Sequence, residues 1–163
     1  MKANLLSGVA AFSLLLGFVT PVMALTSEEV EAVLGVVEQL AQEMGEGMVA
    51  DAAGIFYDYD SLGASLIPAA GFSRDRWVIA YDAVTAGYMA TIPEDEFNAV
   101  FEEPLATLEA SELPEEQKAM LREHVAGLIA EAQAVRQSGM QYADVVRPYE
   151  DRLYPLFYGE FED

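Results

Sequence analysis

The sequence contains no cysteine and only one histidine, His124. The lack of cysteine excludes disulfide bonds, thiolate catalysis and iron–sulfur clusters, because each of these needs a cysteine sulfur. A single histidine likewise excludes any metal site built from several histidines. We therefore expect no metal site and no cofactor, and we interpret His124 as a residue at the edge of an apolar helix face.

Basic residues are scarce: eight Lys and Arg stand against 28 Asp and Glu, which gives a formal charge of −20. Proteins that bind nucleic acids or anionic membranes engage phosphate groups through Lys and Arg. This charge balance therefore argues against both kinds of ligand. It favours a basic partner, because an acidic surface speeds encounters with positively charged proteins.

Motifs of common catalytic and phosphate sites are missing. There is no glycine-rich phosphate loop, and Ser65 lacks the second glycine of a nucleophile elbow. Residues 58–63 resemble the opening of a calcium-binding EF-hand loop, but Leu62 and Ala69 stand where that loop needs oxygen ligands. We expect no catalytic residues. A hydrolase acting through two carboxylates stays open, because Asp and Glu are abundant.

The N-terminal segment (1–24) predicts a cleaved signal peptide of the bacterial Sec type. Lys2 supplies the positive charge, residues 5–19 form an apolar run, and Ala24 is a small residue suited to the cleavage site. Cleavage after Ala24 would leave residues 25–163 as one domain in the periplasm or outside the cell, with no stable membrane insertion. The alternative is a retained anchor, since about 20 apolar residues can span a bilayer.

Helical spacing of apolar residues dominates the remaining sequence, and 53% of the whole chain is hydrophobic. Thr26 and Glu29 fit a capping box before the first helix. Ser73 fits the cap of a second helix, which is apolar on all sides and is therefore expected to be central. Start signals at Pro93 and Pro114 predict two more helices. These patterns predict an all-α fold, a compact bundle of about five helices, some of them kinked or divided at proline.

Two details of this bundle follow from the same spacing. Pro104 is expected to kink or divide the helix that starts near Pro93, and Pro155 is expected to end the last helix. The helix after Pro114 is expected to turn one stripe toward the core. The residues of this stripe are Leu121, Val125, Leu128, Ala132 and Val135.

Five charged residues suggest a structural polar cluster near the start of the second helix: Asp58, Asp60, Arg74, Arg76 and Asp82. A carboxylate buried without a partner is costly, so Asp82, if buried, is expected to be hydrogen-bonded or paired. Our hypothesis is that Arg74 or Arg76 reaches Asp82, Asp58 or Asp60. The alternative is that both arginines extend into solvent.

The C-terminal stretch is rich in aromatic residues that do not fit the apolar stripe of the last helix. We assign a partner-binding surface to Tyr154, Tyr158, Glu160 and Phe161, because exposed tyrosines bordered by acidic residues suit a basic partner. The alternative is that these residues only close one end of the bundle.

Four functions stay open on the sequence alone, the fourth of them a diffuse acidic buffer of cations. The first is a non-catalytic periplasmic binding protein for a basic protein or peptide, such as an adaptor, a chaperone, or an inhibitor or immunity factor. The second is a carrier of a small apolar ligand between helices. Its pocket would be lined by Met44, Met48, Met89, Met120, Phe97, Phe101, Trp77 and Tyr81. The third is the carboxylate-based hydrolase.

Overall fold

The computed structural model describes residues 24–159, which contain helices and no strand. The all-α prediction is confirmed. The predicted signal peptide lies almost entirely outside the described residues. In chain order the elements are α1 (Ser27–Met44), α2 (Ala53–Ser61), α3 (Leu66–Ala69), α4 (Arg74–Thr91), α5 (Glu94–Ala99), α6 (Glu102–Ala110), α7 (Glu115–Gly139), α8 (Ala143–Val146), the 3-10 turn η1 (Arg147–Tyr149) and α9 (Glu150–Tyr158).

The first helix, α1, begins where the sequence predicts. Thr26 Oγ1 accepts a hydrogen bond from the Glu29 N–H at 3.2 Å, and the Thr26 N–H donates to Glu29 Oε2 at 3.2 Å, so the capping box is confirmed. Gly45 ends the helix with a φ of 68°, a backbone conformation that glycine adopts without steric cost. The apolar stripe between them is fully buried and includes Val33, Leu34 and Val37.

Helix α4 is the central element, as its apolar character on all sides predicts. It packs against α1, α2, α7 and α8. Ser73 Oγ accepts from the Arg76 N–H at 3.2 Å, which confirms the predicted cap. Trp77 and Tyr81 have no exposed surface, and the Trp77 indole N–H donates to the Ala53 carbonyl at 2.9 Å. This bond fixes α2 against the core.

Two proline positions differ from the sequence expectation. The helix after Pro93 does divide, but at Val100 and Phe101 rather than at Pro104. Pro104 is the third residue of α6, where the missing N–H would have had no partner within the helix. Pro155 does not end the last helix: α9 continues to Tyr158 and ends at Gly159, which has a φ of 71°.

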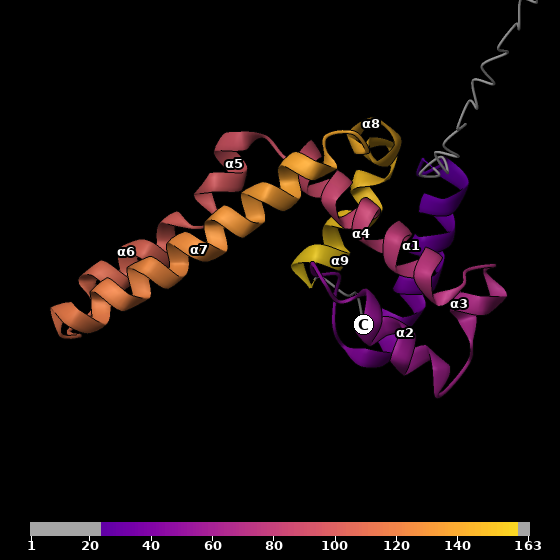
Figure 1. Cartoon of the computed structure of the whole chain (residues 1–163), viewed down its shortest axis with the longest axis horizontal. Helices are drawn as coiled ribbons and strands as arrows, with labels where there is room; N and C mark the ends of the chain where they lie inside the picture. Colours follow the sequence, from indigo (N-terminus) through magenta and orange to yellow (C-terminus); the bar gives the residue numbers. More distant parts are fainter. Residues whose placement is uncertain (1–23, 160–163) are drawn as a thin grey trace, which may run out of the picture.

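Helix α6 and the N-terminal half of α7 form an antiparallel hairpin that projects from the rest of the molecule (Figure 1). We call α6, residues 111–114 and this half of α7 the arm. The C-terminal half of α7 packs on α4, whereas the arm half packs on α6. The predicted compact bundle of about five helices is therefore a helical body with a protruding arm. None of the helices described here is both long and apolar enough to cross a membrane.

The predicted inward stripe of α7 is only partly correct. Val125, Ala132 and Val135 are half-buried, but Leu121 and Leu128 are 41% and 48% exposed. The physical reason is that α6 covers one side of the arm, while the body lies away from the other side (Figure 1). A helical stripe shows which residues share a face, but it does not supply a neighbouring helix to bury that face.

Candidate binding surface

The structure brings together one pair from the predicted polar cluster. Arg74 Nη1 lies 2.9 Å from Asp58 Oδ1, and both side chains are more than half exposed. The Arg74 guanidinium also lies over the Tyr57 ring, 5.1 Å from its centroid. An exposed ion pair of this kind contributes at most about 1 kcal/mol to stability. It joins the end of α2 to the start of α4 at the surface.

Arg76 forms its ion pair with a residue outside the predicted cluster. Its Nε and Nη2 donate to the two carboxylate oxygens of Glu29 at 2.7 and 2.5 Å. The hydrogen bond from Arg76 is the main reason why the pKa of Glu29 lies below its usual range. Glu29 also completes the capping box of α1. The sequence offered one signal for this ion pair, the capping box. The capping box fixes the position of the Glu29 carboxylate, which can also accept hydrogen bonds from an arginine.

Asp60 and Asp82, the two remaining members, do not pair with arginine. Asp60 is 1% exposed and accepts from the Leu66 and Ile67 N–H groups at 2.7 and 2.9 Å, so it holds the start of α3. Asp82 is half-buried, and its Oδ1 has no hydrogen-bond partner among the residues described. Loss of solvation, followed by the charge of Asp51, raises the pKa of Asp82. Asp82 is thus only partly buried, and the partner expected for a buried Asp82 is absent among the described residues.

An apolar groove of about 270 Å³ opens where the arm meets the body. Helices α4, α5, α7 and α9 contribute to it, together with the segment that follows α1. Its lining residues include Met48, Met89, Phe97, Phe101, Phe157 and Tyr158. Four of them belong to the apolar pocket that the sequence predicts: Met48, Met89, Phe97 and Phe101. The other four expected residues lie elsewhere: Trp77 and Tyr81 in the core, Met44 against it, and Met120 on the arm, where it is 61% exposed.

The apolar groove continues along the arm. Val100 borders the groove and also a second, open hollow of about 630 Å³ that follows α6. This hollow is lined by Pro104, Leu108 and, near the tip of the arm, Leu113. Val100 is 56% exposed and Leu113 is 39% exposed. Together the two hollows form an apolar track that runs from the body toward the tip of the arm.

A third hollow, of about 270 Å³, adjoins the apolar groove on the side of α9. We call it the tyrosine–carboxylate pocket. It is lined by Tyr88, Tyr154, Tyr158, Glu96, Glu150 and Asp151. Tyr154 and Tyr158 are each 49% exposed, and their ring centroids are 4.6 Å apart. Tyr88 is buried, and this burial, with smaller effects of Tyr158, Glu150 and Tyr154, raises its pKa to about 12.

The structure thus places two predicted partner-binding residues, Tyr154 and Tyr158, in one pocket, while Glu160 and Phe161 lie outside the described residues. Tyr88, Glu96 and the two acidic residues at the start of α9 were not predicted from the sequence. A local signal existed for the acidic pair, because residues 150 and 151 precede Tyr154 by about one helical turn. No local signal existed for Tyr88 or Glu96, which come from other segments.

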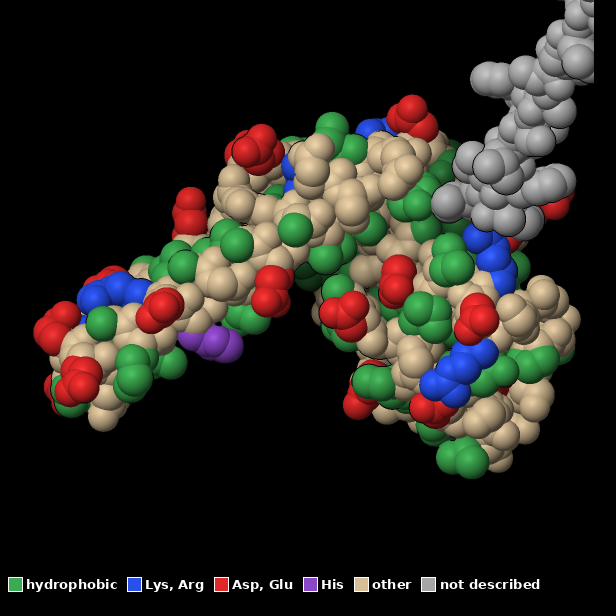
Figure 2. All heavy atoms as spheres, viewed as in Figure 1, with side chains coloured by type: hydrophobic (Ala, Val, Ile, Leu, Met, Phe, Trp, Pro, Cys, Tyr) green, Lys and Arg blue, Asp and Glu red, His purple; other side chains and the backbone are tan. Residues whose placement is uncertain are grey.

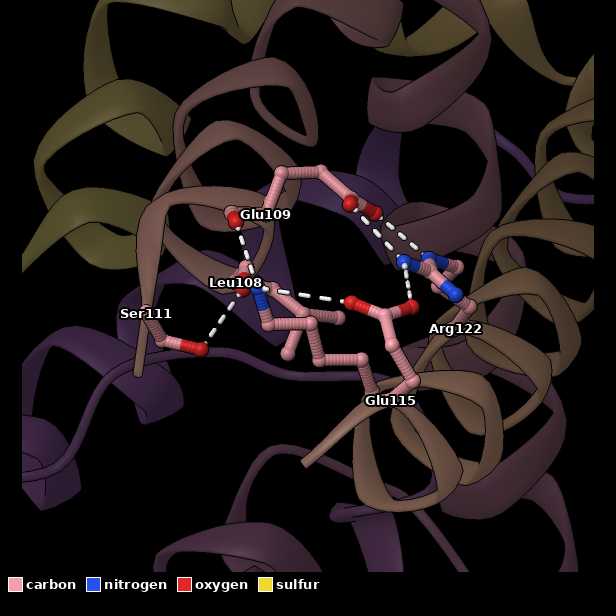
Figure 3. A network of polar contacts seen from close by, with 6 residues as sticks. Leu108, Glu109, Ser111, Glu115 and Arg122 are labelled. Carbon is pink, nitrogen blue, oxygen red and sulfur yellow. Dashed lines mark hydrogen bonds and ion pairs between the residues drawn. The ribbon is translucent and has the colours of Figure 1, made fainter. Parts of the chain in front are cut away.

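The arm is held in shape by polar contacts near its tip (Figure 3). Arg122 of α7 donates from Nε and Nη2 to the two carboxylate oxygens of Glu109 in α6, at 2.5 and 2.9 Å. Its Nη2 also lies 3.5 Å from Glu115. The Lys118 ammonium donates to the Glu109 carbonyl at 2.7 Å. These bonds join α6 to α7 in a part of the structure where α6 has no buried side chain.

Exposed apolar side chains remain on the other side of α7. Met120, Leu121 and Leu128 lie on this face with His124, which is exposed. Figure 2 shows hydrophobic side chains on the edge of the arm that faces the concavity between arm and body. Within the described residues, no three His, Cys, Asp or Glu side chains are arranged to hold a metal ion. The features that stand out are therefore apolar surface, tyrosines and carboxylates.

No family model matches the chain, and neither curated proteins nor solved structures give a significant match.

Proposed function

We propose that this chain is an exported, non-catalytic binding protein whose partner is a basic protein or peptide. The observation that carries the proposal is the apolar track from the body toward the tip of the arm, which Val100 makes continuous. Apolar surface that is exposed along a hollow gains free energy when another molecule covers it. An extended track suits a polypeptide segment, because successive side chains can occupy it along its length.

The charge of the chain supports a basic partner. The formal charge is −20, and acidic residues border both the track and the tyrosine–carboxylate pocket, among them Glu96, Glu103 and Asp151. Complementary charge raises the association rate and excludes acidic competitors, while apolar contacts supply most of the affinity. Such a partner would bind more weakly as salt screens the attraction.

Export is part of the same proposal, with periplasmic or secreted location after cleavage behind Ala24. Leu25 is 8% exposed and packs with the core, so the proposed cleavage site directly precedes the first packed side chain. Mass spectrometry of the mature protein would give an N-terminus at Leu25 if the proposal is right. Retention of the first 24 residues would contradict it.

A carrier of a small apolar ligand is a second candidate, because Met48, Met89, Phe97 and Phe101 line the apolar groove. We rank it lower because the groove, at about 270 Å³, is smaller than most ligand pockets and opens onto the arm. Native mass spectrometry of the purified protein distinguishes the two: a co-purified apolar molecule would favour the carrier.

We assign the pocket carboxylates to binding rather than to hydrolysis. Glu96 and Asp151 are exposed. A carboxyl group that acts as a general acid needs an apolar, water-poor setting that keeps it protonated near neutral pH. Glu96 and Asp151 lack this setting, and exposed acidic side chains of this kind attract cations.

The test is capture of partners by the mature protein from periplasmic extract, at low salt and at about 0.5 M NaCl. We expect a basic protein to be retained at low salt and released at high salt. The double variant Val100→Ser, Leu113→Ser interrupts the track, and it should reduce capture about tenfold, because it removes two apolar contacts. The matched control is Ile79→Ser on α4, where residue 79 is 50% exposed and lies outside the track. Equal capture by both variants would contradict the proposal.

A further inference from the structure

The tyrosine–carboxylate pocket combines two kinds of group that both attract organic cations. The exposed Tyr154 and Tyr158 rings offer π-faces, over which an ammonium or guanidinium group binds when it lies within about 6 Å. Glu96, Glu150 and Asp151 supply negative charge around the same hollow. No lysine or arginine is among the described residues that line the pocket.

The carboxylates of the pocket are largely free of internal partners. Glu150 lies 3.5 Å from Arg147 in an exposed pair, which contributes little. Among the described residues, Glu96 and Asp151 have no ion pair or hydrogen bond through their side chains, in contrast to Glu29, Glu38 and Glu109, which hold arginines. The pocket is therefore a site of uncompensated negative charge next to aromatic rings.

The position of the pocket connects it to the apolar groove. Tyr88, Ile92 and Tyr158 border both hollows. Tyr88 is held by packing on Phe157, whose ring centroid lies 4.5 Å away. A shared rim that is already ordered reduces the entropic cost of binding a ligand across both hollows.

We propose that the tyrosine–carboxylate pocket receives a lysine or arginine side chain of the partner, while a neighbouring apolar side chain of the same segment enters the apolar groove. This inference rests on the proposed function and gives it a recognition rule: a basic residue beside an apolar one. Each hollow has a volume of about 270 Å³, just below the roughly 300–1,000 Å³ of ligand pockets, and has room for one side chain.

The experiment uses a library of acetylated, amidated octapeptides and the mature protein. One position is Arg, Lys, citrulline or Glu, and the other positions are mixtures of Ala, Leu and Ser. Citrulline keeps the shape of arginine but carries no charge. We expect Arg and Lys members to be enriched at least about fivefold over citrulline members, as the strength of cation–π and charge contacts implies.

Two double variants test whether the tyrosine–carboxylate pocket causes the enrichment of Arg and Lys members. Tyr154→Leu with Tyr158→Leu removes the π-faces but keeps apolar volume, and Glu96→Gln with Asp151→Asn removes charge at constant shape. Each should bring the enrichment of basic members to less than about half of its wild-type value. The control, Glu28→Gln with Asp144→Asn, removes the same charge at two exposed residues outside the pocket and should leave the enrichment unchanged.

The outcomes separate this inference from the proposed function. Enrichment of apolar members with no preference for Arg or Lys, or a preference that the control reduces as much as the pocket variants do, would overturn the inference and leave peptide binding in place. Enrichment of no member at all would count against both, and the capture experiment would then decide whether a folded protein is bound.

Discussion

Gly139 of α7 lies directly against the carbonyl group of Ala86 in α4. A β-carbon at residue 139 would overlap the Ala86 carbonyl oxygen, and it would also meet the backbone nitrogen of Gly87. The two helices thus touch backbone to backbone at this crossing. Gly139 is the last residue of α7, so this contact holds the end of the helix that is far from the arm close to α4.

Replacing this glycine should destabilise the body. Gly139→Ala forces α4 and α7 apart, and overpacking of this kind costs about 1–3 kcal/mol of unfolding free energy. The control is Gly127→Ala in the same helix, since a β-carbon at residue 127 would meet no neighbouring group within 4 Å. It should raise helix stability by about 0.5–1 kcal/mol. Urea unfolding measures both, and equal effects would contradict the close crossing.

Asp82 should make the protein less stable at neutral pH than in mild acid, because its carboxylate is half-buried without a cation. Burial raises its pKa in the folded state above the unfolded value, so the folded state binds the proton more tightly. Relative to neutral pH, Asp82 therefore raises the free energy of unfolding at any pH below its pKa in the unfolded state. This gain is lost as the pH rises through its pKa in the folded state.

Asp82→Asn removes this effect. The variant should match the wild type in unfolding free energy near pH 3 and become the more stable of the two as the pH approaches about 7. Asp144→Asn, at an exposed residue, is the control and should show no such trend. A loss of stability in Asp82→Asn that is largest at neutral pH would instead indicate that Asp82 is paired.

Arg152 should hold the last helix on the first. Its Nε and Nη2 donate to both carboxylate oxygens of Glu38 at 2.8 and 2.9 Å, and its Nη1 donates to Glu31 at 2.6 Å. Because the group is about one third exposed, we expect Arg152→Gln to cost only about 1 kcal/mol, less at high salt. Arg147→Gln, whose pair is more exposed, should change the free energy of unfolding by less than about 0.5 kcal/mol.

The arm should open independently of the body. Arg122→Met removes the bonds to Glu109 and Glu115, and amide exchange in α6 and the first half of α7 should then become roughly twofold to fivefold faster. Exchange in α1 and α4 should stay unchanged, since both helices lie away from the arm tip (Figure 1). Uniform acceleration across the chain would show that arm and body unfold together.

Local signals predict the parts of this fold that depend on neighbouring residues. The capping box of Thr26 and the Ser73 cap each follow from residues within about one helical turn, and both are confirmed. The exposed Leu121 and Leu128 could not be predicted, because the spacing of a stripe does not determine whether a neighbour covers it.

Contacts between segments that are distant in the sequence could not be predicted for a similar reason. Arg76 pairs with Glu29, 47 residues away, although Asp58 and Asp82 are closer in the sequence. The tyrosine–carboxylate pocket collects residues from α4, α5 and α9, and only its α9 members share a local pattern. The packing of the helices determines which carboxylates lie near an arginine or a tyrosine. The spacing of residues within one helix does not determine this packing.

The arm carries no chromophore of its own. Residues 102–138 contain no Phe, Tyr or Trp, whereas the only tryptophan, Trp77, is buried in the body. Intrinsic fluorescence and near-ultraviolet dichroism therefore observe the body alone. The substitution Met120→Trp would supply an optical reporter on the projecting hairpin without altering the signal of the body.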